Sequence, residues 1–367
     1  MRETTISRRR FMKTTALATA AAFQPLFWIP RSASAAQELR VWTYNNFITK
    51  EFRQSFESET GIRIRVKLID DQGKELNLLV AEKPNFTADV VTVAGHRFPQ
   101  FINQGTIEPL DESKIKSWET INPVYREADW MIRDGKRWGV PILMGSEGMA
   151  YNEEKMGKVD TWDVMFDERY KGKIAYQVQD FLSIAMQYLG YDGTMVSYLK
   201  RPEVGRRAVE ATKNFLIKHK HLVRAFYDSG AQVQQMFINE DIWVAQCWSG
   251  PAARLIMDGF PIRYTIPREG GFGFVYTFSV VKGARNRENA YKFLNAIMSD
   301  PRQGTYLTKA TGFVSTFVGA EKGLTELERK ASSLSQEELE RITFFSPVAV
   351  EFKYKLFDRA VEEIKAA

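Results

Sequence analysis

The stretch at residues 39–66, LRVWTYNNFITKEFRQSFESETGIRIRV, sets the pattern of the fold. Its two ends alternate apolar and polar side chains, as half-buried strands do. Between them Phe52 and Phe56 lie one helical turn apart, and Gly61 follows where a left-handed helix cap would be expected. The stretch therefore predicts a strand, a helix and a second strand.

The same alternation of elements continues beyond this stretch. Residues 74–82 favour a helix, and residues 89–93 form a short apolar run typical of a buried parallel strand. Further strands are predicted over residues 139–143 leading into 148–152, and over 172–175, 243–248 and 275–281; further helices over 181–189, 203–218, 289–298 and from Ser249 onward. Strands and helices in alternation predict an open, mostly parallel α/β sheet that repeats in a second unit.

Residues 7–13, SRRRFMK, resemble a twin-arginine export signal, with Arg8 and Arg9 as the paired arginines. An alanine-rich apolar run follows, and then the small-x-small sequence ASA at residues 33–35. A membrane anchor is the alternative, but Pro25 interrupts a run that would need roughly 20 apolar residues. We expect residues 1–36 to be a signal peptide that engages the twin-arginine translocase and directs the protein to the periplasm.

This N-terminal segment carries most of the net charge. The chain has 51 basic and 45 acidic residues, a net charge of +6. Residues 1–35 contain six basic residues and one acidic residue, which leaves 45 basic and 44 acidic residues in the remainder. The remainder is nearly neutral, so the charge gives no support for a nucleic-acid partner, which would need a basic surface on the folded domain.

Length and composition describe a globular protein without a disulfide or metal framework. The roughly 330 residues that follow the signal exceed what one compact core holds, so we expect two lobes. Cys247 is the single cysteine, and of the three histidines, His219 and His221 lie in a basic run typical of a solvated surface. No metal-ligating motif is present, and we expect neither a metal nor a cofactor.

Several short motifs along the chain occur together in one family. They are YNNF at 44–47, FESETGI at 56–62, ADVV at 88–91, GTIEPLD at 105–111, WGVP at 138–141, RYKGK at 169–173, LGY at 189–191, WSG at 248–250 and PREGG at 267–271. In their order and spacing the chain resembles the periplasmic solute-binding subunits of ABC importers, of the spermidine/putrescine-binding type. The resemblance covers nearly all of the chain after the signal.

This resemblance implies an α/β fold of the two-lobed periplasmic-binding-protein type (type II, venus-flytrap), with hinge strands between lobes that close over a ligand. It implies lobe 1 from residues 37–144 plus 277–320, lobe 2 from 145–276, and a C-terminal helical segment, 321–367, that packs across the lobes. The expected partners are a small nitrogen-containing organic solute, polyamine-like or zwitterionic, and the membrane subunits of an ABC permease. The protein would act as a monomer and would not be an enzyme.

The resemblance also implies the residues of the binding cleft. They are Tyr44, Asn45, His96, Arg97, Glu147, Asp180, Trp248, Tyr276 and Phe313. Carboxylates and aromatic faces are the groups that bind ammonium ions. Tyr276, however, stands where the family has an aspartate that pairs with an ammonium. We therefore expect a smaller or zwitterionic ligand rather than a long polyamine, with its amine at Asp180 and its acidic group at Arg97.

Other interpretations of these residues stay open. Trp248 is also explained as core, Arg97 as part of a surface ion pair and His96 as a hydrogen-bonded loop residue. Asp180 is placed to cap the helix that follows it, and Glu147 to supply a ligand carboxylate or brace the hinge.

Two other functions are compatible with this sequence. A ligand sensor for a membrane receptor would have the same fold. An enzyme that uses Cys247 with His96 as its base is the third possibility. Against the enzyme, Cys247 should point to the opposite face of its strand from Trp248.

Overall fold

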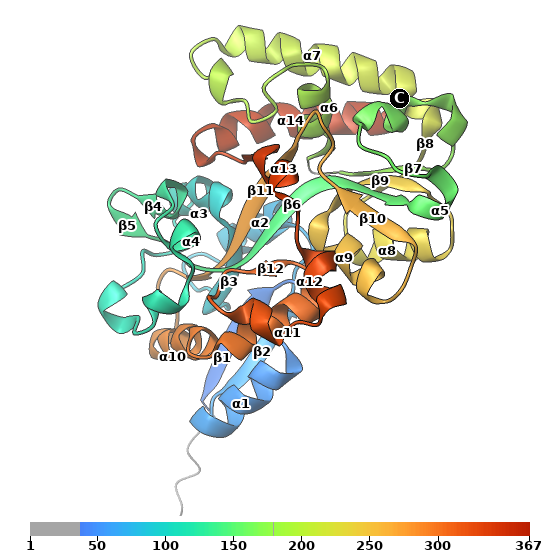
Figure 1. Ribbon diagram of the computed structural model, residues 1–367. Coiled ribbons are helices and arrows are strands. Elements are labelled where there is room, and N and C mark those ends of the chain that lie inside the picture. Colours follow the sequence, from blue (N-terminus) through green and yellow to red (C-terminus); the bar gives the residue numbers. More distant parts are fainter. Residues whose placement is uncertain (1–36, 179) are drawn as a thin grey trace, which may run out of the picture. The chain divides into compact units, whose positions relative to one another are not determined.

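One mixed sheet of 11 strands organises the part of the chain that the computed structural model describes, residues 37–178 and 180–367 (Figure 1). The predicted signal residues Arg8 and Arg9 lie outside the described residues. The main path of the sheet runs β2 (Arg63–Leu68), β1 (Glu38–Thr43), β3 (Val90–Ala94), β11 (Gly271–Val280), β6 (Val140–Asn152), β9 (Val244–Trp248), β7 (Ile174–Gln177) and β8 (Val223–Tyr227). Three shorter strands extend it: β10 (Ile262–Thr265) and β12 (Val314–Ser315) pair with β6, and β13 (Ile342–Phe344) pairs with β11.

Along the main path of the sheet, the strands pair in parallel towards the two ends. β1 pairs in parallel with β2 and β3, and β7 pairs in parallel with β8 and β9. In the middle, β3 pairs antiparallel with β11, β11 with β6 and β6 with β9, while the short β13 adds to β11 in parallel. The expectation of a mostly parallel sheet is therefore wrong for its centre, because β11 runs back against β3 and β6.

The two strands predicted at 139–143 and 148–152 are one strand, β6, of 13 residues, all of them buried. Gly145 and Ser146 interrupt the apolar run in the sequence but not the strand, because β11 pairs with this stretch and holds it extended. β11 itself starts at Gly271, four residues before the predicted strand. β6 and β11 both contribute residues to the pocket described below.

The helices begin where polar side chains cap them. Thr49 accepts a hydrogen bond from the Phe52 amide at the start of α1 (Lys50–Thr60), and Gly61 ends that helix in the predicted left-handed conformation, with φ of 69°. α2 (Gln72–Ala81) begins earlier than predicted because the Asp71 side chain accepts from the Lys74 amide at 2.7 Å. α6 (Phe181–Tyr188), α7 (Pro202–His219), α9 (Ser249–Met257) and α10 (Arg287–Met298) fall in the predicted regions.

Several helices are additional to the predicted set. They are α3 (Phe98–Asn103), α4 (Pro123–Arg126), α5 (Glu153–Met156), α8 (Gly230–Ile238) and α11 (Pro301–Thr311), and a small hairpin joins β4 (Ile132–Arg133) to β5 (Lys136–Arg137). α12 (Glu326–Ser332), α13 (Gln336–Glu340) and α14 (Val350–Ala366) lie within residues 321–367, where a helical segment was expected. α14 packs on both α7 and α3, and Figure 1 shows it running beside α7. None of the helices in the described part of the chain is long and apolar enough to cross a bilayer.

Candidate ligand-binding site

A cavity of about 650 Å³ opens where β1, β3 and β9 end, beside β6 and β11. Its volume is in the range of pockets that enclose a small organic ligand. All nine residues predicted for the cleft line it: Tyr44, Asn45, His96, Arg97, Glu147, Asp180, Trp248, Tyr276 and Phe313. The structure thus brings together side chains that are as much as 269 positions apart in the sequence.

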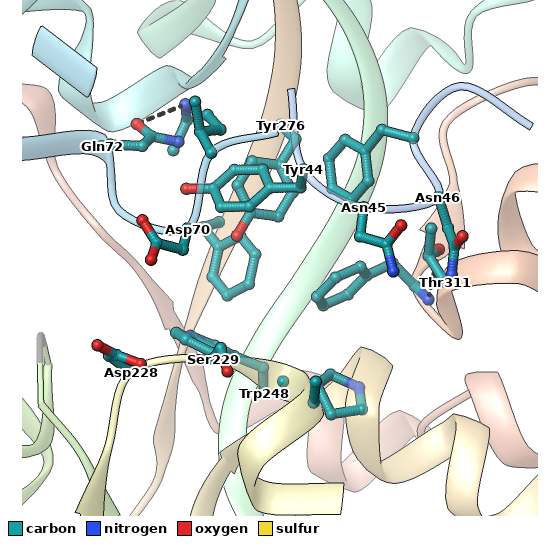
Figure 2. Close-up of a pocket in the computed structure, with 18 of the residues that line it drawn as sticks. Tyr44, Asn45, Asn46, Asp70, Gln72, Asp228, Ser229, Trp248, Tyr276 and Thr311 are labelled. Atoms are coloured by element: carbon teal, nitrogen blue, oxygen red, sulfur yellow. Dashed lines mark hydrogen bonds between the residues drawn. The ribbon is translucent and has the colours of Figure 1, made fainter. Parts of the chain in front are cut away.

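One side of the pocket is an aromatic cluster. The rings of Tyr44 and Tyr276, both labelled in Figure 2, lie 5.2 Å apart. The ring of Phe313 lies 5.7 Å from that of Tyr276, and Phe47 and Phe274 complete the group. Burial raises the pKa of both the Tyr44 and the Tyr276 hydroxyl. Both phenols therefore stay neutral at physiological pH, and this side offers ring faces without charge.

The position of Phe313 depends on two glycines. A Cβ atom on Gly250 would lie 2.8 Å from three atoms of the Phe313 ring, and one on Gly145 would lie 2.5 Å from Phe274 and 2.9 Å from Phe313. Real side chains do not tolerate such distances without movement. Any larger residue at either position would therefore displace the aromatic rings that shape the pocket.

The carboxylate of Asp180 is already paired within the chain. Its Oδ1 atom lies 2.5 Å from Nζ of Lys353, and the Tyr354 hydroxyl donates to the same oxygen at 3.3 Å. Burial opposes ionisation of this carboxyl, but the Lys353 ammonium outweighs it and lowers the pKa of Asp180. Asp180 makes no side-chain cap to α6, so the capping interpretation is wrong. The amine predicted at Asp180 would have to compete with Lys353.

Glu147 is held by two side chains of β9. Its carboxyl oxygens accept hydrogen bonds from Trp248 Nε1 and Gln246 Nε2, both at 3.1 Å. Burial, together with the negative charge of Asp180, raises the pKa of Glu147 well above its ordinary value. The Trp248 ring lines the pocket while its nitrogen is fixed to Glu147, so Trp248 is a pocket wall rather than interior core.

His96 and Arg97 are buried in a short 3₁₀ turn directly after β3. Neither ring nitrogen of His96 has a hydrogen-bond partner among the described residues, which overturns the hydrogen-bonded loop interpretation. Burial first, and then the charges of Lys353 and Arg97, lower the pKa of His96 to about 3, although Asp180 opposes this. His96 is therefore a neutral ring at physiological pH.

Arg97 faces the pocket with most of its hydrogen-bonding capacity unused. Nε donates to Gln100 Oε1 at 2.8 Å, and the guanidinium lies over the Tyr354 ring, 4.6 Å from its centroid. It forms no ion pair within residues 37–178 and 180–367, and it is buried, so the surface ion-pair interpretation is wrong. A guanidinium with free terminal N–H groups is a preferred partner for a carboxylate.

Three further carboxylates that the sequence did not single out line the pocket: Asp258, which is paired with Arg254 at 2.9 Å, and Asp70 and Asp228. Figure 2 shows Asp70 on the side of Tyr44 and Asp228 next to Ser229. Asp70 is exposed and only loosely paired with Lys74, with 3.9 Å between Oδ2 and Nζ. Asp70 and Asp228 lie just after the end of a strand, β2 and β8 respectively, as Tyr44 does after β1. That signal could have found them.

Cys247 lies outside this pocket. Its side chain is buried in a second apolar cluster, against which Trp248 also packs, and unlike Trp248 it does not line the pocket. Burial raises the pKa of its thiol to about 12, which disfavours the thiolate that a nucleophilic cysteine needs. In the described part of the chain, no group of three or more histidine, cysteine or carboxylate side chains is arranged to hold a metal ion.

The sequence model of the bacterial extracellular solute-binding protein family matches residues 51–326. The chain belongs to this family. It is 24% identical over 282 residues to the putrescine-binding periplasmic protein PotF of Escherichia coli, which covers 72% of this chain and 74% of PotF. A putrescine/agmatine-binding protein of Pseudomonas aeruginosa is 25% identical over 320 residues, or 82% of this chain and 83% of that protein.

The solved structures agree on the fold. A putative spermidine/putrescine ABC transporter protein from Listeria monocytogenes superposes with a TM-score of 0.78 at 19% identity, over 90% of this chain and 99% of that one. At this identity the likeness establishes the fold and not the ligand. The two-lobed α/β fold of periplasmic binding proteins is thus confirmed for this member of the family.

Proposed function

We propose that this protein is the periplasmic solute-binding subunit of an ABC importer and carries a small nitrogen-containing organic solute to the permease. The observation that carries the proposal is the convergence of nine side chains from separate segments on one pocket of about 650 Å³. We further propose that residues 37–144 with 277–320 form one lobe and residues 145–276 the other. The pocket would then lie between lobes that close by hinge motion.

The charges around the pocket favour a ligand with both an acidic and an amino group. Arg97 offers terminal N–H groups that have no hydrogen-bond partner within residues 37–178 and 180–367, and these can bind an acidic group. Asp70 and Asp228 offer carboxylates for an amine, and the aromatic cluster offers ring faces to the carbon chain between them. We therefore still propose a zwitterionic ligand whose acidic group binds Arg97. Its amine, which the sequence analysis placed at Asp180, would instead bind Asp70 and Asp228.

Isothermal titration calorimetry on residues 37–367 tests this function. The protein is unfolded and refolded to remove any bound solute, and then titrated with putrescine, spermidine, arginine and γ-aminobutyrate. We expect an amine with an acidic group to bind best, and Arg97→Met to weaken that binding about 100-fold, because a buried charge pair would lose one partner. Arg285→Met, at an exposed position, is the control and should bind as the unchanged protein does. Failure of every compound to bind would count against the proposal.

We propose that residues 1–36 direct folded export through the twin-arginine translocase, on the strength of SRRRFMK at residues 7–13. Replacing Arg8 and Arg9 together by lysine keeps the positive charge and removes the paired arginines. We expect the precursor of this variant to accumulate in the cytoplasm, which cell fractionation and immunoblotting would detect. Periplasmic levels equal to those of the unchanged precursor would disprove this route.

A further inference from the structure

Lys353, on α14, is a buried lysine directly behind residues that line the pocket. Only 3% of its surface is exposed, and its ammonium lies 2.5 Å from Asp180 Oδ1. The same ammonium lies 3.9 Å from the centroid of the Phe345 ring and 4.9 Å from that of Tyr354. Asp180, Phe345 and Tyr354 all line the pocket.

These surroundings are those of a bound alkylamine. A carboxylate at hydrogen-bond distance and aromatic faces within about 6 Å are what proteins use to hold an ammonium ion. Here the ammonium is covalently attached to the chain through the lysine stem. An ammonium site is therefore built into this wall, and a side chain of the protein already fills it.

The charges near this wall make a second ammonium unfavourable. Lys353 and Arg97 are both cations, and Asp180 is the carboxylate that Lys353 neutralises. Both oxygens of Glu147 already accept hydrogen bonds from β9 side chains, and burial raises the pKa of this carboxyl. His96 is neutral. An incoming ammonium would meet two cations, and two carboxyl groups that already have partners within the chain.

We propose that Lys353 is a specificity-determining residue that fills an inner amine site of the pocket and so excludes linear diamines such as putrescine. The inference rests on the proposed function, because it names the class of solute that the pocket accepts. The accepted solute carries no ammonium at its inner end and places an acidic or neutral group toward Arg97. Its amine, where it has one, lies toward Asp70 and Asp228.

Amine rescue of Lys353→Ala tests the proposal. The truncation removes the stem and ammonium and opens space beside Asp180. We expect n-butylamine and putrescine, at millimolar concentrations, to raise the thermal unfolding midpoint of this variant by several degrees, because a ligand that binds only the folded state stabilises it. Calorimetry should show that putrescine binds the variant at least about tenfold more tightly than the unchanged protein.

Two controls separate amine binding from general effects. n-Butanol has the same carbon chain without the charge and should give no rescue. The double variant Asp180→Asn/Lys353→Ala lacks the carboxylate and should not respond to either amine. If Lys353→Ala does not fold alone, the yield of folded protein is measured after refolding in n-butylamine and in n-butanol. A higher yield with the amine supports the proposal.

Equal stabilisation of the unchanged protein and Lys353→Ala by both amines, or no response of Lys353→Ala to either amine, would overturn the inference. Neither result overturns the proposed function, which is tested by binding of the panel compounds to the unchanged protein. If the unchanged protein binds none of the panel compounds while Lys353→Ala is rescued by amines, the proposed function fails and the built-in ammonium site remains. The two failures are therefore distinguishable.

Discussion

Lys353→Met should lower the free energy of unfolding at neutral pH by about 3–5 kcal/mol, the typical effect of removing one partner of a buried ion pair. Methionine keeps most of the length of the lysine stem but removes the ammonium. Asp180, only 5% exposed, would then be a buried carboxylate without a cation. Denaturant unfolding followed by tryptophan fluorescence and circular dichroism measures the change.

Two variants make this result specific. Asp180→Asn/Lys353→Met removes both charges and should recover to within about 2 kcal/mol of the unchanged protein, because well-packed neutral groups often replace a buried pair at little loss. Lys365→Met lies on the same helix, where Lys365 pairs with Glu362 at 3.0 Å on the surface. That substitution should change stability by less than about 1 kcal/mol. Similar effects of Lys353→Met and Lys365→Met would contradict a buried, strong pair.

Because of His96, the free energy of unfolding should decrease as the pH falls from about 7 to about 5. The unfolded chain binds a proton at this residue below its ordinary pKa of 6.5, whereas the folded protein binds it only near pH 3. The stabilising contribution of neutral His96 is thus complete above pH 6.5 and is lost as the pH falls toward 3. At pH 5 the loss amounts to about 2 kcal/mol, at 1.36 kcal/mol for each pH unit below the unfolded pKa.

His96→Phe is the variant that isolates this effect. Glu75 and Glu147 have raised pKa values and act in the opposite direction, since folding favours their protonated forms. They are present in both proteins, so the quantity to compare is the difference in unfolding free energy between the unchanged protein and the variant. That difference should shift by about 2 kcal/mol between the two pH values, in favour of the variant at low pH. Parallel pH profiles would rule out a buried neutral His96.

The sequence predicted those parts of the site that depend on local pattern. The family resemblance implied Tyr44 and Trp248, and each lies at the end of a strand that the sequence pattern predicted; pairing of those strands carries both side chains to one pocket. Gly61 was placed correctly as a helix cap because a left-handed residue after a helix is a local requirement. Neither conclusion needed knowledge of distant contacts.

The parts that were not predicted depend on pairing between distant segments. The continuity of β6 follows from its neighbour β11, which the local sequence of β6 does not encode. The partner of Asp180 is 173 positions away on α14. A signal for it does exist: Lys353 falls on the apolar stripe of that helix with Val350 and Phe357, three and four residues away. A lysine on such a stripe indicates a buried, paired charge.

The position of Lys353 in the chain also orders the events of synthesis. Every strand of the sheet, through Phe344 at the end of β13, is translated before α14 begins at Val350. While a ribosome is still adding the last residues, Asp180 has carboxylate neighbours but no ammonium from its own chain. A nascent chain can therefore assemble the sheet before α14 has emerged. Asp180 gains its ammonium partner only once α14 has docked.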